Sequence, residues 1–209
     1  MEKKISIFST AYLPPIQYFQ LLTKSDEVLI EKHETYQKQT YRNRCVIYSA
    51  NGPLSLIIPV VKPNGNITKI SDVRIDNSVK WRKEHWRAIQ SAYKNSAYFE
   101  FIADYFIQYY EKEWIFIWDY NLKILETLLK ILEIKIKVNE TNEFIKCHPT
   151  NTSDYRFIFN PKQSKLEKEL KLITKPYFQV FGHKTGFIPN LSIFDLISNC
   201  GMDSLGLMA

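Results

Sequence analysis

The chain has 209 residues, enough for one domain with a full hydrophobic core, and its 45% hydrophobic and 24% charged residues are typical of a globular protein. Its 28 basic and 22 acidic side chains give a net charge of +6, which suits a small anionic substrate, a membrane surface or nucleic acid; without a dense lysine–arginine block, nucleic acid is disfavoured. Three widely spaced cysteines exclude a disulfide framework and a zinc spacing and predict a cytoplasmic protein, and six glycines argue against a glycine-rich phosphate loop.

The first elements predict an α/β fold. Ile5 to Phe8 is a short apolar run typical of a buried strand, and Pro15 begins a helix that extends to about Leu22. Val28 to Glu31 is the next strand, so the order strand, helix, strand predicts a parallel pair. The start of such a helix places free backbone donors beside the carboxyl end of a strand, where open α/β sheets gather anions.

The segment from residue 33 to residue 44 is the strongest candidate for ligand binding. It combines three cations with amide side chains and tyrosine rings, and this mixture suits an anionic, ring-bearing ligand such as a nucleotide or nucleotide-sugar. A basic loop that merely stays in water is the alternative. The residues of this basic segment that we expect to bind substrate are Tyr36, Lys38, Tyr41, Arg42, Asn43 and Arg44.

The middle of the chain predicts a hairpin followed by helices. Asn51-Gly52 between two β-rich runs is a strong hairpin signal, and a further extended stretch is expected from Ile67 to Ile75. Apolar residues then recur at helical spacing, and alternating Ile and Lys predict a strand over Ile134 to Val138. The hairpin strands are expected at Cys45 to Tyr48 and Leu54 to Val61, and the helices at Trp81 to Lys94 (capped within Asp76 to Ser78), Tyr98 to Tyr110 and Leu122 to Leu132 (capped by Asp119 or Asn121).

The last part of the chain contains one more predicted strand and helix. Lys146 to Thr152 is expected to be loop, and Pro161 to Lys175 is a charged connector. Tyr177 to Phe181 predicts a strand, and Leu191 to Ser198 predicts a helix that Asn190 caps. Together the patterns predict an α/β fold: a mixed sheet with a strand-helix-strand start, a β-hairpin and a helical middle region.

No metal-binding pattern, nucleophile elbow, Walker loop or dinucleotide fingerprint is present, so any chemistry must use groups that meet only in the fold. His33 follows a strand beside the basic segment and is the better general-base candidate; Glu31 or Glu34 would orient it. His85 shares a helical stripe with core residues, where packing is the commoner role. Asp195 lies among apolar neighbours and needs a partner, and an ion pair with an arginine of the basic segment explains it as well as an acid role does.

Several short sequence blocks follow one another in a distinctive order. They are Tyr12-Leu13-Pro14, Lys38-x-x-Tyr41-x-Asn43-Arg44, Gly52, Ile58-Pro59-Val60, Trp81-x-x-x-His85, Tyr177-x-Gln179, Phe187-x-Pro189-Asn190-Leu191-Ser192-Ile193-x-Asp195-Leu196 and Asn199-x-Gly201. In this order they resemble the WbqC-like protein family over nearly the whole chain, which implies one domain, 1–209, with a mainly helical part at about 77–133. The chain departs from the family pattern at Ser9-Thr10, where many relatives carry Gln-Pro, and at Met202, where many carry Pro.

The resemblance implies a bacterial protein of surface-polysaccharide biosynthesis, notably of the O-antigen of lipopolysaccharide, that acts on an amino sugar or nucleotide-sugar. We therefore expect a transferase for a small anionic sugar-linked substrate, with no metal, cofactor, nucleic acid or membrane span; a non-catalytic binding or scaffold protein is the alternative. Tyr12, Gln179 and Asn190 join the basic segment as substrate-binding residues, and His33, His85 and Asp195 are the catalytic candidates. This reading requires Tyr12, Arg44 and Asp195 to meet in one positively charged pocket.

Overall fold

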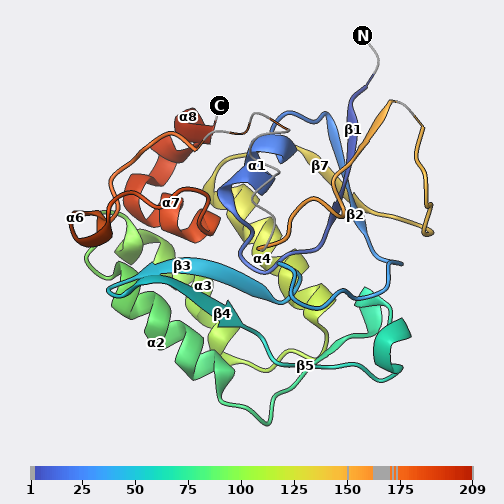
Figure 1. Ribbon diagram of the computed structural model, residues 1–209, viewed down its shortest axis with the longest axis horizontal. Coiled ribbons are helices and arrows are strands. Elements are labelled where there is room, and N and C mark those ends of the chain that lie inside the picture. Colours follow the sequence, from blue (N-terminus) through green and yellow to red (C-terminus); the bar gives the residue numbers. More distant parts are fainter. Residues whose placement is uncertain (1–2, 150, 162–169, 171, 173, 209) are drawn as a thin grey trace.

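The computed structural model describes residues 3–149, 151–161, 170, 172 and 174–208 of the chain (Figure 1). It confirms the predicted α/β class: one parallel sheet, a separate antiparallel hairpin and a group of packed helices. Among the described residues, no helix has both the length and the apolar character needed to cross a membrane.

The parallel sheet has the strand order β7-β2-β1-β8. Its strands are β1 (Ile5–Ser9), β2 (Glu27–Glu31), β7 (Lys137–Glu140) and β8 (Thr152–Asp154), and α1 (Ile16–Leu22) connects β1 to β2. All three strand pairs are parallel, so the predicted strand-helix-strand start is confirmed. Because β2 and β8 lie on opposite sides of β1, the strand order reverses between β1 and β8, which is where open sheets of this kind form a ligand crevice.

The predicted hairpin is also confirmed. β3 (Arg44–Ser49) pairs antiparallel with β4 (Gly52–Ile57), and Gly52 adopts a φ of 100°, which L-residues with a side chain rarely tolerate. The second hairpin strand, predicted over Leu54 to Val61, ends at Ile57. The last two residues of the predicted strand form β5 (Val60–Val61), which pairs with β6 (Arg74–Ile75). The extended stretch expected over Ile67 to Ile75 is wrong for most of its length, because it forms the 3-10 turns η1 (Gly65–Ile67) and η2 (Ile70–Asp72).

The helical middle consists of α2 (Trp81–Tyr93), α3 (Phe99–Glu111) and α4 (Ile117–Ile131). The first two match their predictions closely, since their buried residues recur at helical spacing. α4 begins five residues earlier than predicted, because Ile117 and Trp118 are buried by its first turn. The predicted N-caps are wrong for both α2 and α4: Lys80 and Phe116 occupy the cap positions, without a capping side-chain hydrogen bond.

The described part of the C-terminal region combines short helices with irregular segments. It contains α6 (Gly182–Thr185), α7 (Ile193–Cys200), η3 (Gly201–Asp203) and α8 (Ser204–Met208), and α7 packs against α1, α2, α3 and β3. The predicted last helix is confirmed, but Ser192 caps it: its Oγ accepts from the Phe194 N–H at 3.2 Å. No strand forms over Tyr177 to Phe181, and β8, which was not predicted, begins at Thr152, the last residue of the expected loop. The predicted connector falls largely outside the described residues.

Candidate functional site

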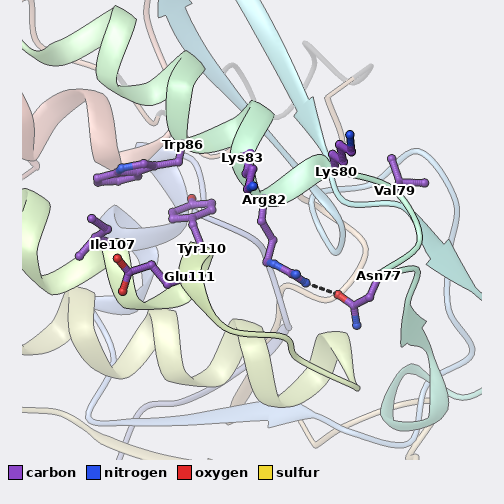
Figure 2. Close-up of a pocket in the computed structure, with 9 residues that line it drawn as sticks. All are labelled: Asn77, Val79, Lys80, Arg82, Lys83, Trp86, Ile107, Tyr110 and Glu111. Atoms are coloured by element: carbon purple, nitrogen blue, oxygen red, sulfur yellow. Dashed lines mark hydrogen bonds between the residues drawn. The ribbon is translucent and has the colours of Figure 1, made fainter.

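A cleft of about 490 Å³ opens between α2 and α3 (Figure 2). Its wall carries the rings of Trp86 and Tyr110, whose centroids lie 5.3 Å apart with planes inclined by 27°. Such a nearly parallel pair presents a broad apolar surface on which another flat ring can pack. The remaining lining residues are Asn77, Val79, Lys80, Arg82, Lys83, Ile107 and Glu111.

The charged lining of this cleft is mainly positive. Lys80, Arg82 and Lys83 contribute three cations, and Glu111 contributes one carboxylate. Arg82 is held in place: its Nη1 donates to Asn77 Oδ1 at 2.5 Å and its Nη2 to Glu113 Oε1 at 3.1 Å. Because a fixed guanidinium loses little conformational freedom on binding, the cleft is suited to an anionic group beside a flat ring.

A buried chain of polar side chains supports this wall from behind. The Tyr110 hydroxyl lies 2.8 Å from the Tyr12 hydroxyl, which lies 3.1 Å from Nδ1 of His85. Burial lowers the pKa of His85 to about 4, and the Ile57 carbonyl accepts a hydrogen bond from its ring. At neutral pH the imidazole is therefore uncharged and its Nδ1 can accept from Tyr12. Tyr12 and His85 are both buried, so the structure brings them together beneath the cleft and not on its surface.

Removing the central hydroxyl of this chain tests its structural role. We expect Tyr12→Phe to lower the free energy of unfolding by about 1–3 kcal/mol, because buried polar groups of His85 and Tyr110 lose their shared partner. Urea denaturation at pH 7 measures the change. Tyr105→Phe alters an exposed hydroxyl on α3 and should change stability by less than about 0.5 kcal/mol. Equal effects of the two variants would contradict the role of the chain.

Arg42 has a different role from the one predicted. Its guanidinium is 1% exposed and donates to both carboxylate oxygens of Glu34, at 2.7 Å from Nε and 2.5 Å from Nη2. Nη2 also lies 3.3 Å from the Arg156 carbonyl oxygen. A cation occupied in this way inside the protein has no free edge for a phosphate, so the structure assigns Arg42 to the core.

A second buried ion pair lies at the carboxyl edge of the sheet. Arg156 Nη1 lies 2.9 Å from Glu31 at the end of β2, and its Nη2 lies 2.6 Å from Asp154 at the end of β8. The rings of Phe144 and Phe157 flank the guanidinium, with centroids 4.8 and 5.4 Å from its carbon. The edge where the strand order predicts a ligand is therefore occupied by the protein's own charges.

His33, one of the catalytic candidates, makes a hydrogen bond that determines which of its ring nitrogens can accept a proton. Its Nε2 lies 3.0 Å from the Thr141 carbonyl oxygen, so this nitrogen carries the proton and the neutral ring keeps Nδ1 as an acceptor. Its backbone N–H donates to Glu31 Oε1 at 2.8 Å. Glu31 thus anchors the main chain at His33, whereas Glu34 pairs with Arg42 instead of orienting the imidazole.

The other residues of the basic segment are dispersed. Asn43 is buried and donates to the Ile58 carbonyl at 2.8 Å, which ties β3 to the chain after β4. Tyr36 is buried, and burial raises its pKa to about 12. Lys38 is exposed, whereas Tyr41 and Arg44 are half-buried. Among the described residues that line the α2–α3 cleft, none comes from this segment.

Asp195 is 1% exposed and lies in a cluster of neutral donors. The Tyr177 hydroxyl donates to its Oδ2 at 2.5 Å and Gln179 Nε2 donates at 3.1 Å, so the predicted ion pair with an arginine of the basic segment is wrong. Burial raises the pKa of this carboxyl above its ordinary value. Gln179 also donates to the Ile188 carbonyl at 2.9 Å, so its amide is largely occupied within the protein.

Asn190 is occupied in a similar way, in a left-handed backbone conformation with a φ of 52°. Its Oδ1 accepts from the Gln17 N–H at 3.1 Å, and its Nδ2 donates to Gln17 Oε1 at 2.8 Å. Tyr12 and Asp195 are both buried and hydrogen-bond to different side chains, and neither they nor Arg44 is among the described residues that line the α2–α3 cleft.

Sequence reasoning missed most of the α2–α3 cleft. Arg82 and Trp86 are four residues apart on a helix, which indicates a shared face, but their partners Asn77, Glu113 and Tyr110 come from other elements. No local pattern predicts that Tyr110, on another helix, packs against the Trp86 ring.

A family model described as the WbqC-like protein family matches residues 10–160, which is more than half of the chain. This range contains the cleft, the Tyr12–His85–Tyr110 chain and both buried ion pairs. The uncharacterized protein Rv1507c of Mycobacterium tuberculosis is 26% identical over 227 aligned residues, which cover 97% of this chain and 96% of that protein. No solved structure matches the chain.

Proposed function

The chain belongs to the WbqC-like protein family, and from this membership and the α2–α3 cleft we propose that it is a transferase of bacterial surface-polysaccharide biosynthesis, such as O-antigen synthesis. Its substrate would be a small anionic sugar, carried by a nucleotide or bearing an amino group. The reaction takes place on a substrate held by the cleft and not by the basic segment.

The chemistry of the cleft is the observation that supports this substrate class. The stacked rings of Trp86 and Tyr110 suit a nucleobase, and Lys80, Arg82 and Lys83 suit a diphosphate. A volume of about 490 Å³ is in the range of ordinary small-molecule sites. The two halves of a nucleotide-sugar thus match the apolar wall and the cationic rim of one cleft.

The cleft also offers a group that can accept a proton. Glu111 is the carboxylate among its described lining residues and is exposed, so it can reach a hydroxyl of an acceptor. His85 is sealed beneath the wall and acts as a positioning residue through Tyr12 and Tyr110. His33 keeps an acceptor nitrogen at the sheet edge and remains the alternative base.

Ligand-induced stabilisation tests the proposal. At about ten times the dissociation constant, the correct nucleotide-sugar should stabilise the protein by about 1.4 kcal/mol, or about 3–5 °C in melting temperature for a chain of this size. Thermal-shift scans with UDP-, dTDP-, GDP- and CDP-sugars provide the measurement. Trp86→Ala and Arg82→Ala should abolish the shift, because they remove the ring and the fixed guanidinium.

Arg87→Ala is the matched control, since Arg87 lies exposed on the same helix but does not line the cleft. It removes the same charge and should leave the shift intact. The proposal fails if none of these sugars, nor any acyl or aminoacyl donor, raises the melting temperature of the wild-type protein. It fails equally if Arg87→Ala removes the shift as completely as Arg82→Ala.

A non-catalytic docking role is the second candidate, and a row of exposed aromatic residues favours it. Tyr98, Phe101 and Tyr105 project from the start of α3 at helical spacing and are exposed on its outer face. Exposed rings in such a row are characteristic of a protein-binding surface. Turnover of a sugar substrate by the purified protein would support the transferase. Binding of the substrate without turnover, in the presence of an acceptor, would support the docking role.

A further inference from the structure

A second, shallower hollow lies at the other end of α3. It has a volume of about 760 Å³ and is bounded by the start of α3, the end of α7, α8 and the Tyr177-Phe178 segment. Its described lining residues are Ala97, Tyr98, Tyr177, Phe178, Asn199, Cys200, Asp203, Gly206 and Leu207. The sequence assigned no ligand to these positions.

The hollow presents aromatic rings on a rigid support. Phe178 is 71% exposed, so its ring is open to a ligand. Tyr98 packs so closely on Gly201 that a Cβ there would lie 2.6 Å from the ring, and its backbone N–H donates to the Ser198 carbonyl at 3.0 Å. The Tyr177 hydroxyl is fixed by Asp195 at 2.5 Å. Tyr98 and Tyr177 are held by these contacts and lose little conformational entropy when a ligand packs on them, whereas Phe178 is the ring most open to a ligand.

The polar groups around the rings are acceptors without a cation. Asn199 lines the floor of the hollow; its Nδ2 donates to the Asp195 carbonyl at 2.8 Å, and its buried Oδ1 has no hydrogen-bond partner within the described part of the chain. Asp203 adds an exposed carboxylate, and no Lys or Arg is among the described lining residues, although Lys175 reaches the Gly206 carbonyl nearby. This lining is opposite in charge to the α2–α3 cleft and disfavours a phosphate.

We propose that this hollow is a saccharide subsite for an uncharged sugar ring of the acceptor, an inference that rests on the proposed transferase function. The apolar C–H faces of a sugar pack on Tyr98 and Phe178, and its hydroxyls donate to the exposed carboxylate of Asp203. Tyr98 and Tyr110 are twelve helical positions apart, so the hollow and the cleft are separated by about 18 Å along α3. The subsite thus holds part of the acceptor remote from the reacting group.

Direct binding of uncharged oligosaccharides tests this inference. Maltotriose and chitotriose are titrated into the full-length protein at millimolar concentrations, with saturation-transfer NMR and calorimetry as readouts. At least one should bind, and Phe178→Ala should weaken it about fivefold to tenfold, the loss expected for one aromatic contact. Asp203→Asn should weaken the same saccharide, because the amide is a poorer acceptor than the carboxylate.

Phe101→Ala is the control: Phe101 is 73% exposed on the same helix as Tyr98 but does not line the hollow. The saccharide affinity of the Phe101→Ala variant should equal that of the wild type. The inference is overturned if neither saccharide binds, if Phe101→Ala weakens binding as much as Phe178→Ala, or if the protein dimerises and Phe178→Ala makes it monomeric, which would assign the hollow to a second copy.

Variants of the cleft separate this inference from the proposed function. Arg82→Ala and Trp86→Ala should leave the saccharide titration unchanged while they abolish stabilisation by the nucleotide-sugar. Saccharide binding without any response to nucleotide-sugars would contradict the substrate of the cleft and leave the hollow as a saccharide site. A response to nucleotide-sugars without saccharide binding would contradict the saccharide subsite in the hollow and leave the proposed function of the cleft intact.

Discussion

Arg42→Ala is expected to lower the free energy of unfolding by about 3–5 kcal/mol, because it leaves the carboxylate of Glu34 buried without its counter-ion. The two side chains are 1% and 2% exposed, so water cannot replace the lost guanidinium. The lost bonds to both carboxylate oxygens, at 2.7 and 2.5 Å, make this site one of the most sensitive in the described structure. Urea denaturation at pH 7, monitored by tryptophan fluorescence, provides the measurement.

Two further variants define what this result means. Lys123→Ala breaks the Lys123–Glu126 pair, whose side chains are more than half exposed, and should cost less than about 1 kcal/mol. The double variant Arg42→Met/Glu34→Leu removes both buried charges and should recover most of the stability that Arg42→Ala loses. If Arg42→Ala instead folds with wild-type stability but no longer responds to nucleotide-sugars, Arg42 is a phosphate ligand and its assignment to the core is wrong.

Asp195→Ala is the second substitution with a large expected effect. It removes the acceptor for the Tyr177 hydroxyl and the Gln179 amide, which lie 2.5 and 3.1 Å from Oδ2. Donors that lose this acceptor in a buried site should cost about 2–4 kcal/mol, most of it at the Tyr177 hydroxyl, because the Gln179 amide keeps its bond to the Ile188 carbonyl. Asp195→Asn keeps a carbonyl oxygen for both donors and should remain within about 1 kcal/mol of the wild type. A similar loss in both variants would show that the charge, and not the acceptor, stabilises the cluster.

The stability difference between the wild type and Asp195→Asn depends on pH, and its sign follows from the direction of the pKa shift of Asp195. Burial raises the pKa of Asp195 above its ordinary value, and hydrogen bonds from Tyr177, Tyr93 and Gln179 oppose this only in part. Between the ordinary and the raised pKa, the folded protein binds a proton that the unfolded chain does not, so stability falls as pH rises through this window. Above the raised pKa, the cost of burying the charged form is present in full.

The wild type should therefore gain stability relative to Asp195→Asn as the pH is lowered through the raised pKa, and the difference should level off below about pH 4, the ordinary value for aspartate. Paired urea titrations of the two proteins between pH 4 and pH 8 measure this difference. A stability difference that stays constant, or that grows in favour of the wild type at high pH, would contradict burial as the dominant influence.

Local patterns predicted most of the regular elements. The strand-helix-strand start, the hairpin turn at Gly52 and the helices α2, α3 and α7 follow from apolar spacing and turn residues that act within a few positions. β8 was missed because Thr152-Ser153-Asp154 is short and polar, and pairing with β1 makes it a strand. A strand was wrongly expected at Tyr177 to Phe181, where side-chain hydrogen bonds to Asp195 and Ile188 take the place of a ladder.

Composition, apolar spacing and short motifs establish the α/β class, the order of most elements, the excess of positive charge and the likeness to the WbqC-like family. Which cations lie at a cleft and which are buried depends instead on contacts between distant residues. Arg156 is buried against Glu31, 125 positions away, whereas Arg82 lies at the rim of a cleft that Tyr110 completes and is paired there with the exposed carboxylate of Glu113. The free-energy cost of burying a charge depends on whether a carboxylate pairs with it and on how far water can reach it. Both depend on tertiary contacts and cannot be read from the neighbouring residues of the chain.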